Sequence, residues 1–409
     1  MHPLLHSVLQ GHTGVDALGT ALRLAGGPLR TDRGDDSVAL TFVWLGDAPA
    51  VSLQCGLVPG GASIELDRLG DLPVWSAELV APRDTLVSYR FVIDDPFLGA
   101  HDLDDDGWQR LMLVAQQRSF ADPHNPERIA PLAVLFGLPV PPEQYESVLA
   151  LDHAPSAPWF QPHDAPPGSL HRFEHTSAAL GDRRAITVWT PPVPATEHPL
   201  VLLLDGTSFL QLAELPHALD LAVARGDMRP PIVAFVHEAE GSAGLADRTR
   251  ELSCNPAHAS MLVDELLPEL RRRFPVSTEP ADTVLGGASL GGLASAFTAT
   301  GRPDVVGNVL SVSGSFWFGL ERDGRDQWLT RQLQIEPVRG LRWYQQIGRL
   351  EDGPLAVAPD VTHLQANRNL HELLVTQGVD VTYDELGTAH DVCAFRVAVL
   401  RGLCALLPR

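Results

Sequence analysis

The stretch ADTVLGGASLGGLASAFTAT, residues 281–300, restricts the possible folds of this chain more than any other part of the sequence. It reads as a short apolar strand, a glycine-rich turn and an alanine-rich helix. Gly287 and Gly291 stand two residues before and after Ser289, which gives the pattern Gly-x-Ser-x-Gly. Because glycine has no Cβ atom, this pattern permits a sharp strand-to-helix corner. It predicts that Ser289 projects above the carboxyl edge of a parallel sheet; the competing interpretation is a tightly packed turn of small residues.

Apolar segments alternate with helical segments on both sides of this corner. The segments that resemble strands read RRAITVWTPP, HPLVLLLDG, PPIVAFVHE, VVGNVLSVSGS, GLRWYQQIG and VDVTYDEL. The helical segments read ASMLVDELLPELRRRFP, VTHLQANRNLHELLVTQG and DVCAFRVAVLRGLCALL. Strands that alternate with helices build a mainly parallel sheet covered by helices on both faces. Residues 169–409 are therefore predicted to form an α/β domain of the α/β-hydrolase type.

The first 168 residues have a different character. Residues 1–35 look helical and then turn-like, whereas residues 36–150 hold short alternating runs such as SVALTFVWLG and LVSYRFVI, separated by Gly, Pro and Asp. Such runs are typical of a small antiparallel β-domain, so a β-sandwich-like N-terminal domain is expected. Residues 151–168 are rich in Pro, Ala and His and read as a linker. Two roles are compatible with this β-domain: a wall of an active site, or the contact of a homodimer.

Composition excludes several classes of function. The 409 residues include 30 basic and 51 acidic side chains, which gives a formal net charge of −21. Nucleic acids and anionic membranes bind positive surfaces, so neither is an expected partner. No apolar stretch reaches the roughly 18 residues of a membrane helix. The first residues, MHPLLHSVLQGHTGVDALG, lack the basic start and apolar core of a signal peptide, so a cytoplasmic location is expected.

No bound metal or other cofactor is expected. The cysteines form no Cys-x-x-Cys pair and are predicted to be free thiols. They are Cys55, Cys254, Cys393 and Cys404. The acidic run with Asp102, Asp104 and Asp106 resembles the start of a calcium loop, but apolar residues around Ala115 replace the closing glutamate. We therefore interpret this run as a solvated acidic loop.

A serine hydroxyl is a weak nucleophile unless a base removes its proton. In a hydrolase with such a strand–serine–helix corner, an acid and then a histidine follow the serine along the chain. His390 lies in LGTAHDV, a short loop between the last strand and the last helix, and is the predicted general base. The other downstream histidines, His363 and His371, lie in a helical stretch and fit solvated or capping roles.

The acid that orients the histidine should follow a late strand. The segment RWYQQIGRLEDG presents Glu351 and Asp352 directly after such a strand. Glu351 is the predicted acid, which would hold the imidazole in the correct tautomer and stabilise the imidazolium. Asp352 and Asp360 remain alternatives, whereas Asp384 lies inside a strand and is disfavoured. The competing interpretation of Glu351 is an ordinary surface carboxylate.

Two backbone N–H groups are needed to stabilise the oxyanion of an acyl-transfer reaction. One is expected from Leu290, which directly follows the nucleophile, close to the N-terminus of a helix. The second is expected from the loop after LVLLLDG, around Gly206 and Thr207. Gly206 would let the backbone turn toward the substrate, although a plain turn glycine is the competing interpretation.

Several segments together resemble the enterochelin (enterobactin) esterase family. In the C-terminal half they read VLLLDG, RTRELSCNP, GGASLGG, SVSGSFWF, IGRLED and GTAHDV, and nearer the N-terminus FVWLG, VSYRF and FADPHNPER. The resemblance covers residues 36–409. It implies an esterase-D-like α/β-hydrolase domain preceded by a β-domain. It also implies a serine esterase that opens ester bonds of a ferric catecholate trilactone siderophore such as enterobactin, with iron as part of the substrate.

A bulky anionic substrate of this kind calls for arginines and aromatic side chains. Arg248, Arg250 and Trp317 follow strands near the expected catalytic edge and are candidate binding residues. The alternatives are local: Arg250 pairs with a neighbouring acid, and Trp317 belongs to the core. The same fold also carries other esterases and acyltransferases, so an acetyl or feruloyl sugar ester is the alternative substrate. A catalytically inactive binding protein is the third possibility, disfavoured by the complete set of serine, acid and histidine.

Overall fold

The computed structural model describes residues 1–59, 62–98, 105–131, 140–241, 245–355 and 357–409. The chain forms two compact units. The first comprises Met1–Pro155 together with Gly387–Ala394, and the second comprises Ser156–Leu386 together with Phe395–Arg409. The predicted boundaries after residues 35, 150 and 168 stay predictions. Asp102 and Asp104 of the proposed acidic loop lie outside the described residues, whereas Asp106 lies in a helix that begins at Asp105 rather than in a loop.

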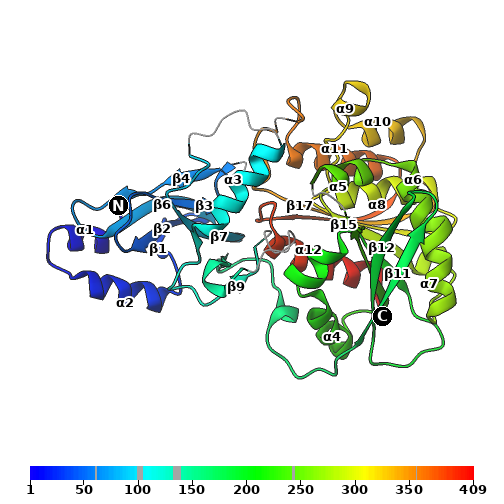
Figure 1. Cartoon of the computed structure of the whole chain (residues 1–409), viewed down its shortest axis with the longest axis horizontal. Coiled ribbons are helices and arrows are strands. Elements are labelled where there is room, and N and C mark those ends of the chain that lie inside the picture. The colour runs from blue at the N-terminus through cyan, green and yellow to red at the C-terminus, as the bar shows by residue number, and fades with distance from the viewer. Residues whose placement is uncertain (60–61, 99–104, 132–139, 242–244, 356) are drawn as a thin grey trace. The chain divides into compact units, whose positions relative to one another are not determined.

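The first unit contains two antiparallel sheets (Figure 1). In one, the strand order is β1 (Leu29–Asp32), β2 (Ser37–Leu45), β6 (Val74–Pro82) and β5 (Asp67–Arg68). In the other, it is β4 (Ser63–Glu65), β3 (Val51–Cys55), β7 (Leu86–Ile93), β10 (Glu146–Ala150) and β9 (Arg128–Ile129), with β8 (Ser119–Phe120) also on β7. The rings of Phe42 and Tyr89 lie 5.1 Å apart, so β2 and β7 face each other across a shared core, as in a sandwich.

Helices α1 (Pro3–Leu9) and α2 (Val15–Ala25) lie beside strand β1 of this unit (Figure 1). They bury an apolar face in a cluster with the strands. Its members are Leu5, Val8, Leu18, Leu22, Leu29, Val43, Leu69 and Val74. Helix α2 is followed by Gly26 at its C-cap, whose φ of 69° is a left-handed conformation that glycine adopts without strain. The remaining helical elements of the unit are α3 (Asp105–Gln117) and the short η3 (Pro142–Gln144).

The second unit is built on one sheet of eight strands. Their order is β11 (Ser169–Ser177), β12 (Asp182–Thr190), β14 (Ile232–Ala239), β13 (Leu200–Leu203), β15 (Thr283–Ala288), β16 (Asn308–Val312), β17 (Arg342–Gly348) and β18 (Asp380–Leu386). The strands from β14 to β18 in this order are parallel, and β11 and β12 are antiparallel. The sequence did not indicate β11, because SLHRFEHTS is largely polar and mostly exposed at the sheet edge.

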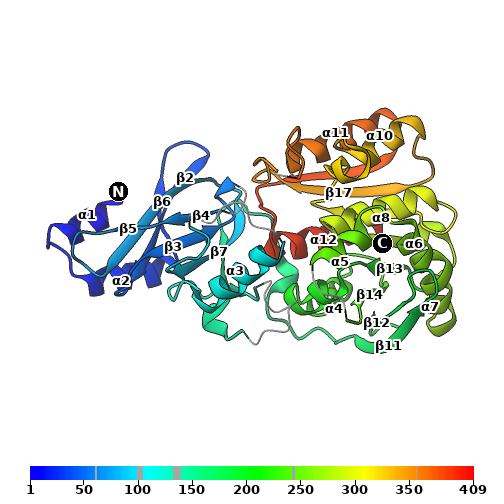
Figure 2. The same cartoon turned by 45° about the horizontal axis from the view of Figure 1, so that its top comes forward.

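Helical segments connect these strands. They are η4 (Pro158–Phe160), η5 (Ser208–Leu212), α4 (Leu215–Arg225), α5 (Leu245–Leu252), α6 (Pro256–Ser260), η6 (Met261–Leu266), α7 (Leu267–Arg273), η7 (Pro280–Asp282), α8 (Leu290–Gly301), α9 (Leu320–Asp323), α10 (Trp328–Ile335), α11 (His363–Thr376) and α12 (Val392–Leu406). Helices α10 and α11 lie side by side (Figure 2). The helix predicted over ASMLVDELLPELRRRFP is divided into α6, a π-helical turn η6, and α7.

Helices cover both faces of this sheet. Leu310 and Ser311 are consecutive residues of β16, so their side chains point to opposite faces. A methyl group on Gly402 of α12 would lie 2.1 Å from Leu310, whereas one on Gly292 of α8 would lie 2.7 Å from the Ser311 hydroxyl. Helices α12 and α8 therefore pack closely on opposite faces of the sheet. The predicted α/β-hydrolase fold, preceded in the sequence by a β-sandwich-like domain, is confirmed.

Two further predictions can be checked against the structure. All four cysteines are free thiols, and Cys55, Cys254 and Cys393 are buried. Within the described residues, no helix combines the length and the apolar character that a bilayer crossing requires.

Candidate active site

Ser289 occupies the corner between β15 and α8, as predicted. Its φ of 58° and ψ of −122° form a strained backbone conformation for a residue with a side chain. A methyl group on Gly287 would lie 2.8 Å from the backbone of Gly291, so the two glycines allow the strand and the helix to approach this closely. Leu290 is the first residue of α8, and N–H groups in the first turn of a helix have no partner within the helix. This backbone group is therefore suited to bind an oxyanion.

The loop that follows β16 packs against this corner. Ser315 donates its backbone N–H to the Ser289 carbonyl at 3.0 Å, and the Ser315 and Ser289 hydroxyls lie 3.2 Å apart. Ser313, two residues earlier, has a φ of 44°. The segment SVSGSFWF, singled out in the sequence, thus contacts Ser289, the predicted nucleophile, through Ser315.

Glu351, which follows β17, is buried against the loop that follows β16. Its Oε1 accepts hydrogen bonds from the Ser313 hydroxyl at 2.7 Å and from the Gly348 backbone N–H at 2.9 Å. Its Oε2 lies 3.4 Å from Nδ1 of His363. The loop after β16 therefore contacts both Ser289 and Glu351, although the catalytic role of Glu351 stays a prediction.

The alternative acids have other surroundings. Asp352 is exposed and accepts a hydrogen bond from Thr362, at the start of α11. Asp360 is exposed as well. Asp384 accepts hydrogen bonds at 2.8 Å from Tyr344 and from Arg401. Burial and the donated hydrogen bonds favour Glu351 over these three.

His363 differs from its expected solvated or capping role. The ring is buried, and its Nε2 donates to the Gly314 carbonyl at 2.9 Å, while Thr362 caps the helix. The ring edge also meets Trp317, with centroids 6.4 Å apart. His371 is half-buried and stacks on Tyr383 at 4.1 Å. The sequence could not show that His363 is buried, because the loop that covers it comes from residues about fifty positions earlier in the chain.

His390 is exposed and lies in the segment Gly387–Ala394, which belongs to the first unit. Strand β18 ends at Leu386, and α12 begins at Val392. The carboxyl ends of β15, β17 and β18 share one edge of the sheet because these strands are parallel. Chain connectivity thus brings the chain out of the sheet at the same edge just before His390. Its role as the general base stays a prediction.

Gly206 has a structural reason to be glycine. A methyl group there would lie 2.7 Å from the backbone of Phe235 and 2.8 Å from that of Val236, so the loop runs directly against β14. The preceding residue, Asp205, has a φ of 56°. The predicted oxyanion loop is therefore held in a close approach to the neighbouring strand.

A chain of hydrogen bonds fixes the residue after Gly206, and sequence reasoning missed it. The Thr207 hydroxyl lies 2.6 Å from Oε2 of Glu238 and 2.8 Å from Nδ1 of His237, whose Nε2 lies 2.8 Å from the Thr187 hydroxyl. Burial lowers the pKa of His237 to about 4 and raises the pKa of Glu238. Neutral His237 can accept from Thr187 and donate to Thr207, which then donates to Glu238. One signal was available: the polar pair His-Glu ends an otherwise apolar strand.

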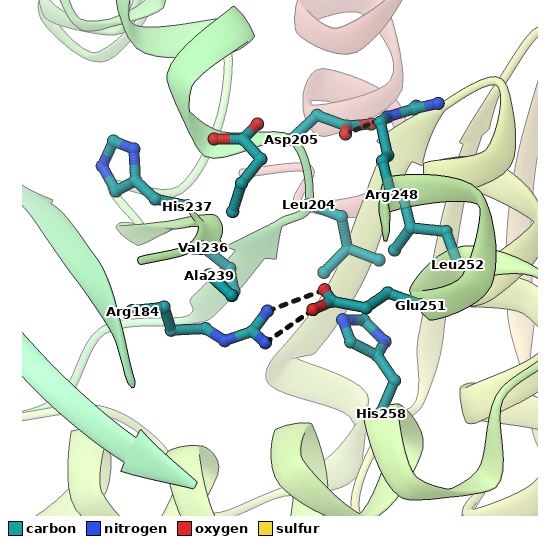
Figure 3. A pocket seen from close by; sticks show the side chains of 11 residues that line it. Arg184, Leu204, Asp205, Val236, His237, Ala239, Arg248, Glu251, Leu252 and His258 are labelled. Carbon is teal, nitrogen blue, oxygen red and sulfur yellow. Dashed lines mark hydrogen bonds and ion pairs between the residues drawn. The ribbon is translucent and has the colours of Figure 1, made fainter. Parts of the chain in front are cut away.

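Arg248 forms an ion pair with Asp205 (Figure 3). Its Nε lies 2.5 Å from Oδ1, and a terminal nitrogen lies 2.7 Å from Oδ2. A methyl group on Gly291 would lie 2.9 Å from Oδ2, so this carboxylate covers the first turn of helix α8. The charge of Arg248 is already matched by Asp205, and its predicted contact with substrate stays untested.

A second ion pair involves helix α5, which also carries Arg248. Glu251 of α5 receives two hydrogen bonds at 3.0 Å from Arg184 of β12, and His258 lies next to this pair (Figure 3). Burial lowers the pKa of His258 to about 3. These residues line a pocket with Arg248, and its volume of about 20 Å³ has room for about one water molecule. The pocket is therefore too small for a siderophore.

The other two candidate binding residues lie in different settings. Arg250 is exposed and pairs with Asp247 at 2.7 Å, which is the local pairing anticipated for it. Trp317 is half-buried and packs against the hydrophobic core of the second unit. Neither observation tests a contact with substrate.

The chain matches known proteins over nearly its whole length. Residues 177–406 match the family model of putative esterases. The iron(III) enterobactin esterase of Dickeya dadantii is 30% identical over 377 residues, which cover 84% of this chain and 79% of that protein. The iron(III) salmochelin esterase of Escherichia coli is 26% identical and covers 90% of this chain and 87% of its own length.

Solved structures show the same fold. The ferric enterobactin esterase of Salmonella typhimurium has a TM-score of 0.79 at 23% identity and covers 95% of this chain and 98% of its own. The Shigella flexneri enterobactin esterase, solved in the presence of enterobactin, has a TM-score of 0.75 at 22% identity, covering 93% and 96%. The domain that carries Ser289 is thus an esterase domain. The chain belongs to the enterochelin (enterobactin) esterase family, which confirms the resemblance seen in the sequence.

The Asp205–Arg248 pair is expected to stabilise the fold rather than only the site. Asp205→Asn keeps a residue that tolerates a positive φ but leaves Arg248 without its counter-charge. Because Arg248 is only partly exposed, we expect a loss of about 2 kcal/mol in the free energy of unfolding. Urea unfolding followed by tryptophan fluorescence measures this loss. Asp247→Asn, which removes the partner of exposed Arg250, is the matched control and should cost under about 1 kcal/mol. Equal losses in both variants would contradict the expectation.

Proposed function

We propose that this protein is a serine esterase that hydrolyses the ester bonds of a ferric catecholate trilactone siderophore such as enterobactin. The observation that carries the proposal is the match to an iron(III) enterobactin esterase and an iron(III) salmochelin esterase, which spans most of the chain rather than the esterase domain alone. The strained Ser289 corner supports the same chemistry, because a serine held at the end of a strand and the start of a helix is placed for nucleophilic attack.

In the proposed reaction, Ser289 Oγ attacks the carbonyl carbon of an ester while His390 takes the hydroxyl proton. Glu351 orients His390, and the N–H groups of Leu290 and Gly206 bind the oxyanion. The C–O bond to the alcohol then breaks, and His390 returns the proton to the leaving alkoxide. Water attacks the acyl-serine with His390 again acting as base, which releases the acid and restores Ser289. Thr207, held by His237 and Glu238, would fix the loop that supplies the Gly206 N–H.

Iron enters this proposal only as part of the substrate, and no resident cofactor is proposed. The ferric complex is anionic while the protein carries a net charge of −21, so a local positive group must receive it. Arg250 is the better candidate of the two arginines. Both are paired with a carboxylate, but the Arg250 side chain is 71% exposed, whereas Arg248 is 23% exposed and is held by the buried Asp205. Trp317 is proposed to contribute an aromatic surface beside the loop after β16. We expect the reaction to take place in the cytoplasm.

The test is a comparison of substrates. The protein is incubated separately with iron-loaded enterobactin, iron-free enterobactin, and acetylated or feruloylated sugars, and the products are identified by mass spectrometry. The proposal predicts linear fragments of the trilactone and their monomer units. Cleavage of the sugar esters alone would overturn it in favour of a carbohydrate esterase. Binding of the ferric siderophore without any product would instead identify a binding protein.

A further inference from the structure

The loop Gly387–Ala394, called the histidine loop below, is part of the first unit although the chain enters it from β18 and leaves it through α12. Its residues Gly387, Thr388 and Ala389 are buried, and so are Cys393 and Ala394. His390, between these groups, is exposed. Both ends of the loop are therefore buried, whereas the His390 side chain between them is exposed.

The first anchor is a backbone connection to strand β7. The paired residues of β3 and β7 end at Cys55 and Tyr89, and one further hydrogen bond follows, from the Gly56 N–H to the Ser88 carbonyl at 3.2 Å. The first residues of β7, Leu86 and Val87, extend beyond this point. The N–H of Leu86 donates to the Gly387 carbonyl at 2.9 Å, and Leu86 and Thr388 form a parallel bridge. The histidine loop thus continues the pairing of β7 where β3 stops.

The second anchor is the carboxylate of Asp391, the residue directly after His390. Its Oδ2 accepts the backbone N–H of Ser88 in β7 at 2.9 Å. Its Oδ1 accepts the N–H of Ala394 and the thiol of Cys393, both at 2.9 Å, and so caps helix α12. Burial raises the pKa of Asp391 to about 6, which leaves it mostly ionised at neutral pH. One carboxylate therefore joins β7 to the start of the last helix.

The third anchor is a close packing contact at the residue before His390. A methyl group on Gly56, just after β3, would lie 2.7 Å from the Cβ atom of Ala389. Real Cβ atoms do not approach this closely, so Gly56 leaves just enough room for Ala389. Gly56 does not have a positive φ, so its backbone conformation is one that other residues also adopt. A glycine is required at this position because of the contact with Ala389.

We propose that the N-terminal β-domain positions the general base of the esterase, by holding the histidine loop on both sides of His390. Gly56 and Asp391 are then positioning residues, which act on the reaction only through His390. This inference rests on the proposed function, in which His390 takes the proton of Ser289. It gives the β-domain a role in catalysis, exerted through the histidine loop that belongs to the same unit.

Gly56→Ala tests the packing contact. The added methyl group must push Ala389, so we expect kcat for ferric enterobactin to fall between roughly 10- and 100-fold, with KM changed less than about twofold, because a misplaced base slows chemistry without removing binding contacts. Ala389→Gly removes the clashing atom, and the double variant Gly56→Ala/Ala389→Gly should regain most of the lost kcat. Ala389→Gly alone measures the effect of that change. Gly14→Ala, in open space within the same unit, is the matched control.

Asp391→Asn tests the carboxylate anchor independently. The amide has the same shape but only one acceptor oxygen, so either the Ser88 or the Ala394 N–H loses its partner. We again expect a fall in kcat of about tenfold with an unchanged KM. A change in thermal stability alone, with kcat as in the wild type, would contradict the inference. So would a loss of kcat in Gly56→Ala that Ala389→Gly fails to reverse.

His390→Ala separates this inference from the proposed function. If His390→Ala retains activity, the assignment of the base is wrong. If His390→Ala is inactive while folded Asp391→Asn and Gly56→Ala keep the kcat of the wild type, the base is correct and positioning by the β-domain is wrong. Should Gly56→Ala fail to fold, Asp391→Asn alone decides between these outcomes.

Discussion

Replacement of Ser289 by alanine is expected to lower kcat for ferric enterobactin by roughly 10⁴-fold or more. The substitution removes the Oγ that is proposed to form the acyl-enzyme. Because members of a serine–histidine–acid set act as a unit, the remaining groups cannot replace it. Alanine keeps a Cβ atom at the strained corner and leaves the backbone contacts to Val312 and Ser315 in place. The rate is measured from product formation by mass spectrometry, with siderophore binding followed by quenching of tryptophan fluorescence.

Two further variants make this result specific. Ser295→Ala, on the same helix, removes a hydroxyl that donates to the helix carbonyl of Gly291 at 2.7 Å, and should leave kcat within about twofold. Ser289→Gly should be as inactive as Ser289→Ala but more stable by about 1 kcal/mol or more, because glycine relieves the strain of the positive φ. Retention of activity by Ser289→Ala would show that another group carries the reaction.

The position of Ser289 at a strand-to-helix corner was predictable because the information for it is local. An apolar strand, a turn with glycines at fixed positions and a helix occupy one continuous stretch, and Ser289 lies where that pattern places it. The parallel sheet was predictable for the same reason, since strands such as β13 and β14 contain continuous apolar runs. Strand β11 lacked such a run, and only its pairing with β12 defines it.

The surroundings of Glu351 were not predictable from its own segment. The sequence places Glu351 and Asp352 side by side, and nothing in RLEDG separates them. The structure does, because Ser313 reaches Glu351 from a loop 38 residues earlier and leaves Asp352 exposed. The burial of His363 depends on the same loop. Contacts between distant segments decide which side chain is enclosed, and a single sequence carries no local signal for them.

The same limit applies to charged groups. Arg248 and Arg250 are equivalent in RTREL as far as composition shows. The structure distinguishes them by their partners. Arg248 pairs with Asp205, 43 residues earlier in the chain, whereas Arg250 pairs with the nearby Asp247. The association of the histidine loop with the β-domain is a still longer-range feature, since Ser88 and Asp391 are 303 residues apart. The sequence predicted both segments but could not show that they meet.

Replacement of Glu351 by glutamine is expected to lower kcat by between roughly 10² and 10⁴-fold, while Asp352→Asn leaves it within about twofold. Glutamine can still accept from Ser313 and Gly348 through its carbonyl oxygen, so the local structure should persist. What it loses is the negative charge that stabilises an imidazolium and fixes its tautomer. The two substitutions lie at adjacent positions, and each replaces one carboxylate by a neutral amide. They are therefore a matched pair.

The measurement is kcat and KM for both variants on ferric enterobactin, with thermal unfolding to show that each is folded. A fall in kcat for Glu351→Gln at unchanged KM assigns Glu351 as the acid, because binding of the siderophore does not require the ionised carboxylate. If Asp352→Asn shows the larger fall, the acid is Asp352, and the hydrogen bonds from Ser313 and Gly348 serve only to hold the loop after β17. If neither variant loses activity, the reaction proceeds with Ser289 and the histidine alone, and the burial of Glu351 must be explained by its contacts with Ser313 and His363.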